Sequence, residues 1–303
     1  MASTRESDPP ANVTTPPSTA SRGSGALKAR PWVENRPSSS TLLPKFDLRE
    51  LWAYRDVGII LALRDVKVRY KQTFFGIGWA LLQPLLAMVL FTLVLGSRGA
   101  KIPSQGLPYS AFVLVGLAVW FPFNTALSTS AESLTQNPAL VTKVYFPRLL
   151  APLGAILASL LDLAIATAIA LVVSVVAGVP LQPTAPFLLI GILWYIAIAV
   201  GFGAGLSSLN VLYRDVRYAL GFSIQLLFFA SPIVYPSTLT HGALQTVLAV
   251  NPLVGLVDFF RWAILGAPVD SSTLLVSLGA TVVLLTASLL FFRRMERRFA
   301  DRI

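Results

Sequence analysis

The most informative part of the chain is residues 149–178, which read LLAPLGAILASLLDLAIATAIALVVSVVAG. Asp162 is the only charged residue in this stretch, and the stretch exceeds the roughly 20 residues that a helix needs to cross a hydrocarbon core of about 30 Å. It therefore predicts a transmembrane helix. Because an ionised carboxylate is costly inside a membrane, we expect Asp162 to face a cavity or a neighbouring span. A structural hydrogen bond and a substrate contact both fit that position.

Five further stretches are apolar and uncharged, and we expect each to span the membrane. They cover approximately residues 76–96, 108–131, 185–209, 218–235 and 272–292. Pro122 should kink one of them, and Pro232 interrupts the shorter fifth span of the chain. The sequence thus predicts an all-α integral membrane protein with six transmembrane helices in one transmembrane domain, residues 73–303.

The amino-acid composition agrees with this class. Hydrophobic residues make up 55% of the 303 residues, charged residues make up 13%, and the mean hydropathy is +0.70. A soluble domain of this length needs more polar surface, so the missing water-facing area must face lipid. The chain has no cysteine and a single histidine, His241, which excludes thiolate sites and a histidine metal centre.

The N-terminal part of the chain divides into two segments. Residues 1–44 are rich in Pro, Ser and Thr, and we expect a disordered cytoplasmic tail because they bury too little apolar surface. Residues 45–72 place apolar residues roughly on one helical face, which predicts an amphipathic helix, or two in series, at the membrane interface. Four of its basic residues would contact lipid headgroups or, as the alternative, a lipid diphosphate at the cytoplasmic entrance. They are Arg64, Lys67, Arg69 and Lys71.

Residues 237–266, between spans five and six, have a different pattern. Asn251 followed by Pro252 is typical of a helix start, and Gly266 is typical of a helix end. A helix of this length is too short to cross the membrane. With the apolar segment 243–250, it predicts a re-entrant helical pair, and two further full spans are the alternative.

The net charge of +10 has a topological explanation. An even number of spans places both termini on one side, and with that side in the cytoplasm every Lys and Arg except Arg98, Lys101 and Arg261 lies inside. This distribution follows the positive-inside rule. The basic composition therefore indicates orientation and gives no support to nucleic-acid binding.

The chain carries no motor for active transport. The phosphate-binding pattern GxxxxGK[ST] is absent, and the glycines at 201, 203 and 205 lie in a predicted span, where close helix packing explains them. Paired carboxylates, a Ser-His-Asp set and a metal-ligand cluster are also absent from the sequence. We expect a transport subunit that is no enzyme, has no cofactor of its own, and receives its energy from another polypeptide.

Five segments of the chain carry a resemblance to a known family. They are residues 64–73 followed by Gly76, Trp79, Gln83 and Pro84; residues 137–148; residues 213–217; residues 231–236; and residues 251–253 with 260–261. They resemble, in the same order, signatures of the ABC-2 type permeases of polysaccharide exporters, and the resemblance covers about residues 46–300. The long Pro/Ser/Thr tail departs from that family's usual short amino terminus.

The resemblance implies a homodimer of six-span subunits with two copies of a cytoplasmic ABC ATPase, in a bacterial inner or plasma membrane. It implies export of a lipid-linked polysaccharide of the O-antigen, teichoic acid, capsule or cell-wall galactan type. A small lipid or drug is the alternative cargo. A short helix that ends before Pro147 would couple to the ATPase, and an ordinary loop helix is the alternative. Its candidate residues are Asn137, Pro138, Leu140, Val141, Lys143, Tyr145 and Phe146.

Aromatic residues recur in the spans, and most of them should pack against lipid or neighbouring helices. Sugar rings also stack on aromatic faces, so a glycan path could use some of them. Trp120, Phe121 and Tyr235, near the predicted outer mouth, are the leading candidates. Arg261 either guides an anionic group or pairs with Asp258 at i,i+3.

Overall fold

The computed structural model of the chain describes residues 48–71, 76, 78–97, 104–136, 146–213, 215–239 and 248–299. Within these residues all regular structure is helical and no strand occurs. They belong to the larger of two compact units into which the chain divides, residues 43–303. The predicted tail, residues 1–44, lies outside the described residues.

Five helical segments are long and apolar enough to cross a membrane. Their bounds lie within a few residues of predicted spans, except that the last helix continues past the predicted end at Phe292. The segments are α3 (Gly78–Phe91) with the π-helical turn η1 (Thr92–Ser97), α4 (Tyr109–Glu132), α6 (Leu150–Val176), η2 (Ala185–Phe187) with α7 (Leu188–Leu212), and α11 (Ser271–Phe299).

The fifth predicted span is shorter than expected. Helix α8 (Val216–Phe229) has 14 residues and ends before the turn at Ser231 and Pro232. At 1.5 Å per residue it is about 21 Å long, less than a hydrocarbon core of about 30 Å. The described residues therefore contain five helices of spanning length where the sequence predicted six.

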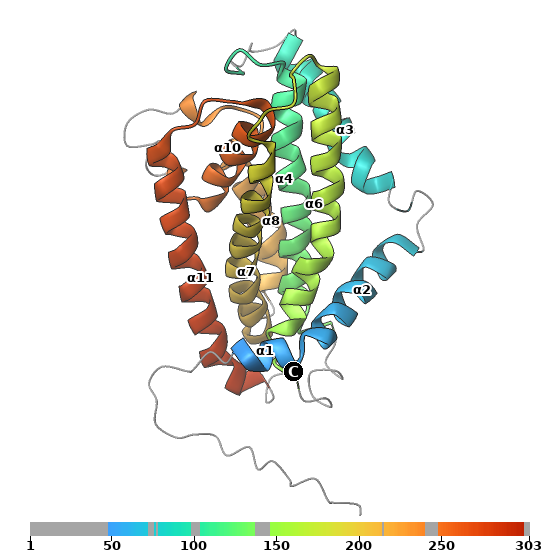
Figure 1. Cartoon of the computed structure of the whole chain (residues 1–303). Coiled ribbons are helices and arrows are strands. Elements are labelled where there is room, and N and C mark those ends of the chain that lie inside the picture. The colour runs from blue at the N-terminus through green and yellow to red at the C-terminus, as the bar shows by residue number, and fades with distance from the viewer. Residues whose placement is uncertain are drawn as a thin grey trace, which may run out of the picture. The chain divides into compact units, whose positions relative to one another are not determined.

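The directions of the long helices follow from their contacts (Figure 1). Helices α7 and α11 are parallel, because Trp194 bonds to Thr281 and Gly205 faces Ser288 further along both helices. Helices α4 and α7 are also parallel. Helix α8 is antiparallel to α4, since its start pairs with the end of α4 and its end packs on the middle of α4. Helices α3 and α6 share the direction of α8.

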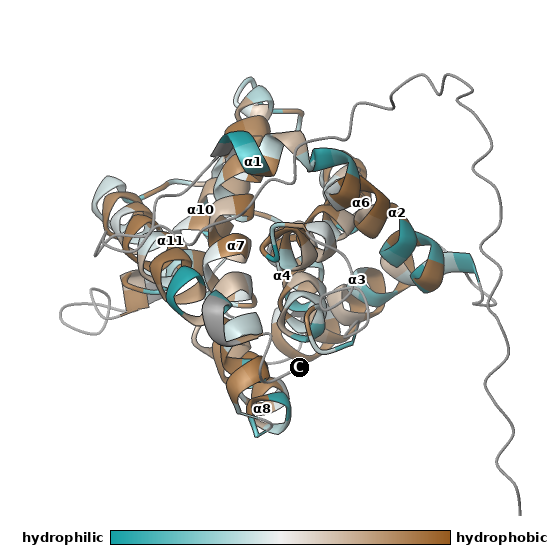
Figure 2. Ribbon diagram, turned by 90° about the horizontal axis from the view of Figure 1, so that it is seen from below, coloured by the Kyte–Doolittle hydropathy of each residue, from teal (hydrophilic) through white to brown (hydrophobic). Residues whose placement is uncertain are grey.

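Helix α4 forms the centre of this helical unit. Buried residues make up 78% of the most apolar 18 residues of α4. The corresponding share is 6% for α3 with η1 and 11% for α11. Seen along the bundle, α4 lies inside a ring of helices, and the outer helices carry apolar residues (Figure 2). The exposed apolar faces of α3 and α11 are the surfaces that we expect lipid or a partner to cover.

The segment predicted as an amphipathic interface helix forms two helices, α1 (Leu48–Ala53) and α2 (Arg55–Lys71), so the expectation of one or two helices in series is met. Its place at the membrane interface stays a prediction. Helix α2 packs closely along the first half of α6. A Cβ atom at Gly154 would come within 2.9 Å of Leu61 Cβ and 3.3 Å of the Gly58 carbonyl oxygen. The two glycines therefore let the backbones approach.

Helix α10 (Pro252–Leu265) has the ends that the sequence predicted. The Asn251 side chain accepts a hydrogen bond from the Leu253 amide at 3.1 Å, and Gly266 ends the helix with φ of 68°. A short 3₁₀ turn, η3 (Ser237–Leu239), precedes the undescribed part of this connection. Local capping chemistry therefore fixes both ends of α10.

Helix α11 begins with a capping carboxylate. Asp270 accepts hydrogen bonds from the side chains and amides of Ser272 and Thr273. The pKa of the Asp270 carboxyl group is lowered, because the Ser272 side chain and then the Thr273 side chain donate hydrogen bonds to its ionised form. The other end of α11 packs in a separate apolar cluster with residues near the starts of α1 and α6.

Candidate functional site

Helix α4 has a cavity on each of two sides. Because successive helical residues point about 100° apart, adjacent residues of α4 face different cavities. Trp120 and Asn124 line a cavity beside α8, whereas Phe121 and Thr125 line a cavity beside α2, α3 and α6. The two neighbouring aromatic residues that the sequence proposed for one path thus belong to different sites.

We call the cavity beside α2, α3 and α6 the Asp162 cavity. Its volume is about 270 Å³. Its polar lining consists of Arg69, Tyr70, Gln83, Thr125 and Asp162. Apolar groups that include Trp79, Pro84 and Phe121 complete the wall.

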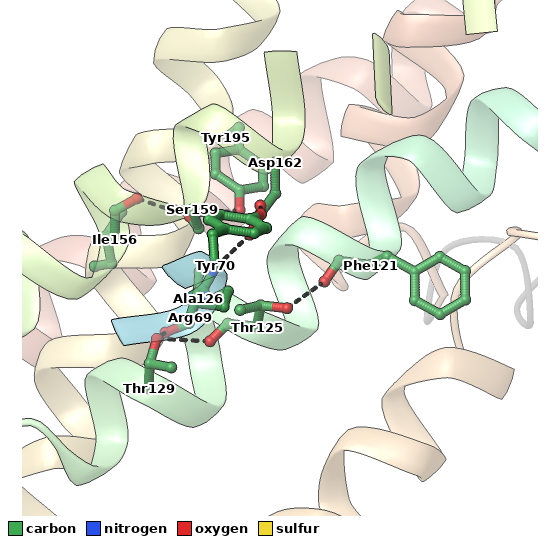
Figure 3. Close-up of polar contacts among 10 residues, drawn as sticks. All are labelled: Arg69, Tyr70, Phe121, Thr125, Ala126, Thr129, Ile156, Ser159, Asp162 and Tyr195. Atoms are coloured by element: carbon green, nitrogen blue, oxygen red, sulfur yellow. Dashed lines mark hydrogen bonds and ion pairs between the residues drawn. The ribbon is translucent and has the colours of Figure 1, made fainter. Parts of the chain in front are cut away.

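The acidic residue of this cavity is held by the end of α2 (Figure 3). The Arg69 guanidinium and the Tyr70 hydroxyl each donate a hydrogen bond to one carboxylate oxygen of Asp162. The side chains of Arg69 and Asp162 are 24% and 11% exposed. An ion pair with an added hydrogen bond is the arrangement that makes a buried carboxylate tolerable. The expectation that Asp162 faces a cavity and a partner is confirmed.

Polar groups behind Asp162 form a layer between α6 and α7. The Ser159 hydroxyl lies 3.1 Å from the Tyr195 hydroxyl, and Ser159 also donates to the Ile156 carbonyl. Both Ser159 and Tyr195 are fully buried. Their hydroxyl groups are hydrogen-bonded within the core, so we assign them a structural role. Asp162, in contrast, lines the cavity.

We call the second cavity the α8 groove. Its volume is about 470 Å³, and it combines aromatic side chains with uncharged polar ones. Its lining includes Trp120, Asn124, Ser128, Gln225, Phe228 and Phe229. The Trp120 and Phe228 rings meet edge to face with centroids 5.2 Å apart, which fixes the aromatic wall. Aromatic rings beside amide groups can contact both the C–H faces and the hydroxyl groups of a sugar.

Arg261 is buried where α10, α4 and the turn after α8 meet. Its guanidinium donates to the Ile233 carbonyl at 2.8 Å, and it lies 3.6 Å from the centroid of the Phe112 ring. Its Nη1 atom is 3.6 Å from Asp258 Oδ1, so the predicted i,i+3 ion pair is present. Arg261 is only 1% exposed, and its contacts hold α10 against α4 and the turn after α8.

Tyr235 contacts Arg261. Its hydroxyl donates to the Phe229 carbonyl at 2.9 Å, and its own carbonyl accepts from Arg261 at 3.5 Å. Among the cavities lined by described residues, none is therefore shared by the four residues proposed for a glycan path, Trp120, Phe121, Tyr235 and Arg261. Trp120 alone of the four lines the α8 groove.

The four basic residues proposed at the entrance have different surroundings. Arg64 pairs with Asp65 at 2.8 Å, and Arg69 pairs with Asp162. Lys67 and Lys71 are exposed on α2. Half of this predicted cluster is thus paired with carboxylates, and its contact with headgroups or a diphosphate stays a prediction.

Most of the proposed coupling segment lies outside the described residues. Phe146 is buried at 5% exposure. The ends that flank the segment are held by long-range contacts, because Glu132 pairs with Arg217 at 2.9 Å and Arg148 donates to the Glu296 carbonyl at 2.7 Å. Outside the described residues are Asn137, Pro138, Leu140, Val141, Lys143 and Tyr145.

Several lining residues were missed by the sequence reasoning. Gln83 is an amide in the otherwise apolar α3, and Gln225 lies in the apolar second half of α8. Asn124 and Thr125 belong to a polar run in the second half of α4. A polar residue inside a membrane span signals a cavity or a partner, because lipid offers it no hydrogen bond. The same signal led to the prediction for Asp162, whose charge makes it conspicuous, whereas the neutral residues carry no charge and were not singled out.

Comparison with known proteins gives consistent matches. The ABC-2 type transporter family matches residues 58–265. Over 262 residues, the chain is 29% identical to the O-antigen export system permease protein RfbA of Myxococcus xanthus, covering 84% of this chain and 98% of the relative. A Klebsiella pneumoniae protein of the same name is 26% identical over 270 residues, 86% and 99% of the two chains. The polysialic acid transport protein KpsM of Escherichia coli is 25% identical over 243 residues, 78% and 92%.

Proposed function

The chain belongs to the ABC-2 type transporter family, and on this premise we propose that it is the permease subunit of an exporter for a lipid-linked polysaccharide. The observation that carries the proposal is the similarity to O-antigen export permeases over nearly their whole length. The α8 groove supports it, because its aromatic and amide lining suits a sugar polymer. The cargo would be of the O-antigen, capsule, teichoic acid or cell-wall galactan type.

We further propose six membrane crossings with both termini in the cytoplasm. Helices α7 and α11 are parallel, so the chain must return between Leu212 and Ser271. Helix α8 runs in the required direction and would make most of this crossing, with the turn after it completing the distance. The basic residues Arg148, Arg217 and Arg293 would then lie on the cytoplasmic side.

A re-entrant segment fits the contacts of α10. The Arg261 guanidinium bonds to the Phe112 and Ile233 carbonyls, while Asn251 bonds to the earlier Ala230 carbonyl and the Ser231 hydroxyl. We propose that the chain dips back between Tyr235 and Asn251, and that α10 then returns it to the outer side. Buried backbone of this kind is tolerated at membrane depth when protein surrounds it.

The proposal places α1 and α2 at the cytoplasmic interface. Ile60, Leu63 and Val68 of α2 are 65%, 53% and 71% exposed, so they would contact lipid. Lys67 and Lys71 would contact headgroups, with a lipid diphosphate as the alternative. Because α2 also follows α6 and reaches Asp162, its C-terminal end would lie deeper than its start.

We propose that two copies of this subunit assemble with two copies of a cytoplasmic ABC ATPase. Helix α8 exposes Tyr218, Phe222 and Phe229, at 84%, 66% and 64%, on one side. A second copy or the polymer would cover these aromatic groups. The ATPase would engage residues 137–146, and ATP with magnesium would bind to that partner. The assembly would lie in a bacterial inner or plasma membrane.

Deletion of the gene tests the cargo. We expect surface polysaccharide to fall to background and lipid-linked glycan to accumulate inside the cell, since the export step is removed. Complementation with the full chain should restore the surface polymer, whereas an Asn124→Leu/Gln225→Leu double variant should restore less of it at equal membrane levels. The replacement Val283→Ala, at a position 67% exposed on α11, is the matched control. Unchanged surface polysaccharide after deletion would instead favour a small lipid or drug as cargo.

A further inference from the structure

Gln83 has hydrogen-bonding groups that the protein leaves unused. It lies in α3, whose remaining residues from Gly78 to Phe91 are almost all apolar, and it is exposed where it lines the Asp162 cavity. Among the described residues, no protein group is hydrogen-bonded to its side chain. An amide of this kind is costly beside lipid, so its position over a cavity indicates a polar occupant.

The cavity offers both donors and acceptors to such an occupant. The Gln83 amide can donate and accept, and each Asp162 oxygen can accept a further bond besides those from Arg69 and Tyr70. The Thr125 hydroxyl uses its proton on the Phe121 carbonyl at 3.1 Å, which leaves its oxygen as an acceptor. This mixture suits a group with several hydroxyls.

The charges of the cavity argue against an anionic occupant. Arg69 is its only cation among the described lining residues, and Asp162 already pairs with it. A phosphate bound here would have to displace a carboxylate from its ion pair and lie beside that carboxylate. The net charge of the pair is zero, so a neutral ligand is favoured.

The size of the cavity suits a small unit. Its volume of about 270 Å³ lies just below the range of about 300–1,000 Å³ for common small-molecule sites. The Trp79 side chain, 46% exposed, contributes an indole to the wall. One sugar ring could lie with its C–H face on an aromatic group and its hydroxyls toward Gln83 and Asp162.

From these observations we propose that the Asp162 cavity binds a single uncharged hexopyranose unit of the lipid-linked glycan, separately from the α8 groove. The assignment rests on the proposed function for the source of the sugar. The sugar and the diphosphate of the substrate would then bind at separate sites. The diphosphate would bind at exposed cations such as Lys67 and Lys71.

Photolabelling of the whole complex tests the proposal. The permease with its ATPase would be placed in lipid nanodiscs and exposed to alkyl glucosides, galactosides, mannosides and rhamnosides that carry a diazirine on the sugar ring. We expect peptide mapping to find label at the cavity segments of α3, α4 and α6. Gln83→Leu and Thr125→Val should each lower this labelling about tenfold, because each removes a hydrogen-bonding group.

A matched control is available in the other cavity. Gln225→Leu makes the same chemical change in the α8 groove and should leave labelling at the Asp162 cavity unchanged. All variants would be compared at equal thermal stability, so that loss of label reports the site. Equal labelling of the parent, Gln83→Leu and Thr125→Val proteins would overturn the assignment.

Protection experiments identify the source of the sugar. Purified lipid-linked glycan should block the labelling, whereas a hexosyl diacylglycerol and a sugar-free polyprenyl diphosphate should not. Protection by either of the latter two would overturn the proposal, in favour of a membrane glycolipid or an anionic headgroup. If gene deletion abolishes surface polysaccharide but the cavity takes no sugar probe, this inference fails alone. If labelling and glycan protection occur while deletion leaves the polysaccharide intact, the proposed function fails and the sugar site remains.

Discussion

A carboxylate within a membrane helix needs compensating partners, and Asp162 receives two from the end of α2. The Arg69 side chain comes from a position 93 residues earlier in the chain. The two charges neutralise each other. Their side chains form the polar part of the cavity lining together with Tyr70, Gln83 and Thr125. The same pair fixes the C-terminal end of α2 against α6, so one contact determines both the chemistry of the cavity and the position of a helix.

Replacing one member of this pair should be more harmful than replacing both. Arg69→Met leaves a carboxylate uncompensated, with an expected loss of about 3–5 kcal/mol. Adding Asp162→Asn should restore a large part of that loss, because the remaining groups are neutral. Thermal unfolding of the permease in detergent measures both effects.

The control for this comparison is on the same helix. Arg64 pairs with Asp65, but its side chain is 42% exposed, so Arg64→Met should cost only about 0–1 kcal/mol. Equal losses of stability for Arg69→Met and Arg64→Met would show that the Asp162 pair carries no special weight.

Among the elements, α10 depends on others to hold it in place. Arg261 joins α10 to the α4 backbone and to the turn after α8. Gly116 makes this junction tight, because a Cβ atom there would lie 2.5 Å from the Ile233 carbonyl oxygen and 3.1 Å from the Arg261 guanidinium. Backbone cannot move aside as a flexible side chain can.

We therefore expect Gly116→Ala to destabilise the fold by about 1–3 kcal/mol, the usual cost of overpacking a core. The control is Gly279→Ala in α11, where a Cβ atom would meet nothing within 4 Å and the helix propensity of alanine is higher. Denaturation in detergent compares the two variants. A neutral Gly116→Ala together with a destabilising Gly279→Ala would contradict the packing described here.

Across the helical unit, six helices alternate in direction along the chain. Helices α3, α6 and α8 run one way, and α4, α7 and α11 run the other. Both α1 and the C-terminal end of α11 lie at the same end of the bundle (Figure 1). Five of the six helices are of spanning length, and the alternation is the reason to assign a crossing to the shorter α8 as well.

The absence of cysteine in the sequence allows a direct test of this topology. Pro183→Cys and Pro268→Cys, both at exposed positions of the proposed outer side, should react with a membrane-impermeant maleimide in intact cells. Gln136→Cys and Tyr213→Cys, exposed at the proposed cytoplasmic side, should react only after permeabilisation. Labelling of Tyr213→Cys in intact cells would exclude the six-span arrangement.

Local patterns in the sequence were sufficient for the five spanning helices and for both ends of α10, but not for the ends of α8 and α11. Long uncharged runs gave the five spanning helices, because lipid tolerates few unpaired polar groups. Asn251, Pro252 and Gly266 correctly gave both ends of α10, since capping is decided by a few neighbouring residues. The prediction that the glycines at 201, 203 and 205 serve packing is also confirmed by their close contacts with α4 and α11.

Local patterns did not reveal which polar groups would meet. Asp162 with Arg69, and Arg261 with the Ile233 carbonyl, are pairs that depend on which helices lie side by side. The two sides of α4 likewise separate Trp120 from Phe121 only once α8 and α3 are in place. Hydropathy measures how each segment partitions into lipid, whereas these sites arise from close packing between distant segments, and that packing exists only in the folded molecule.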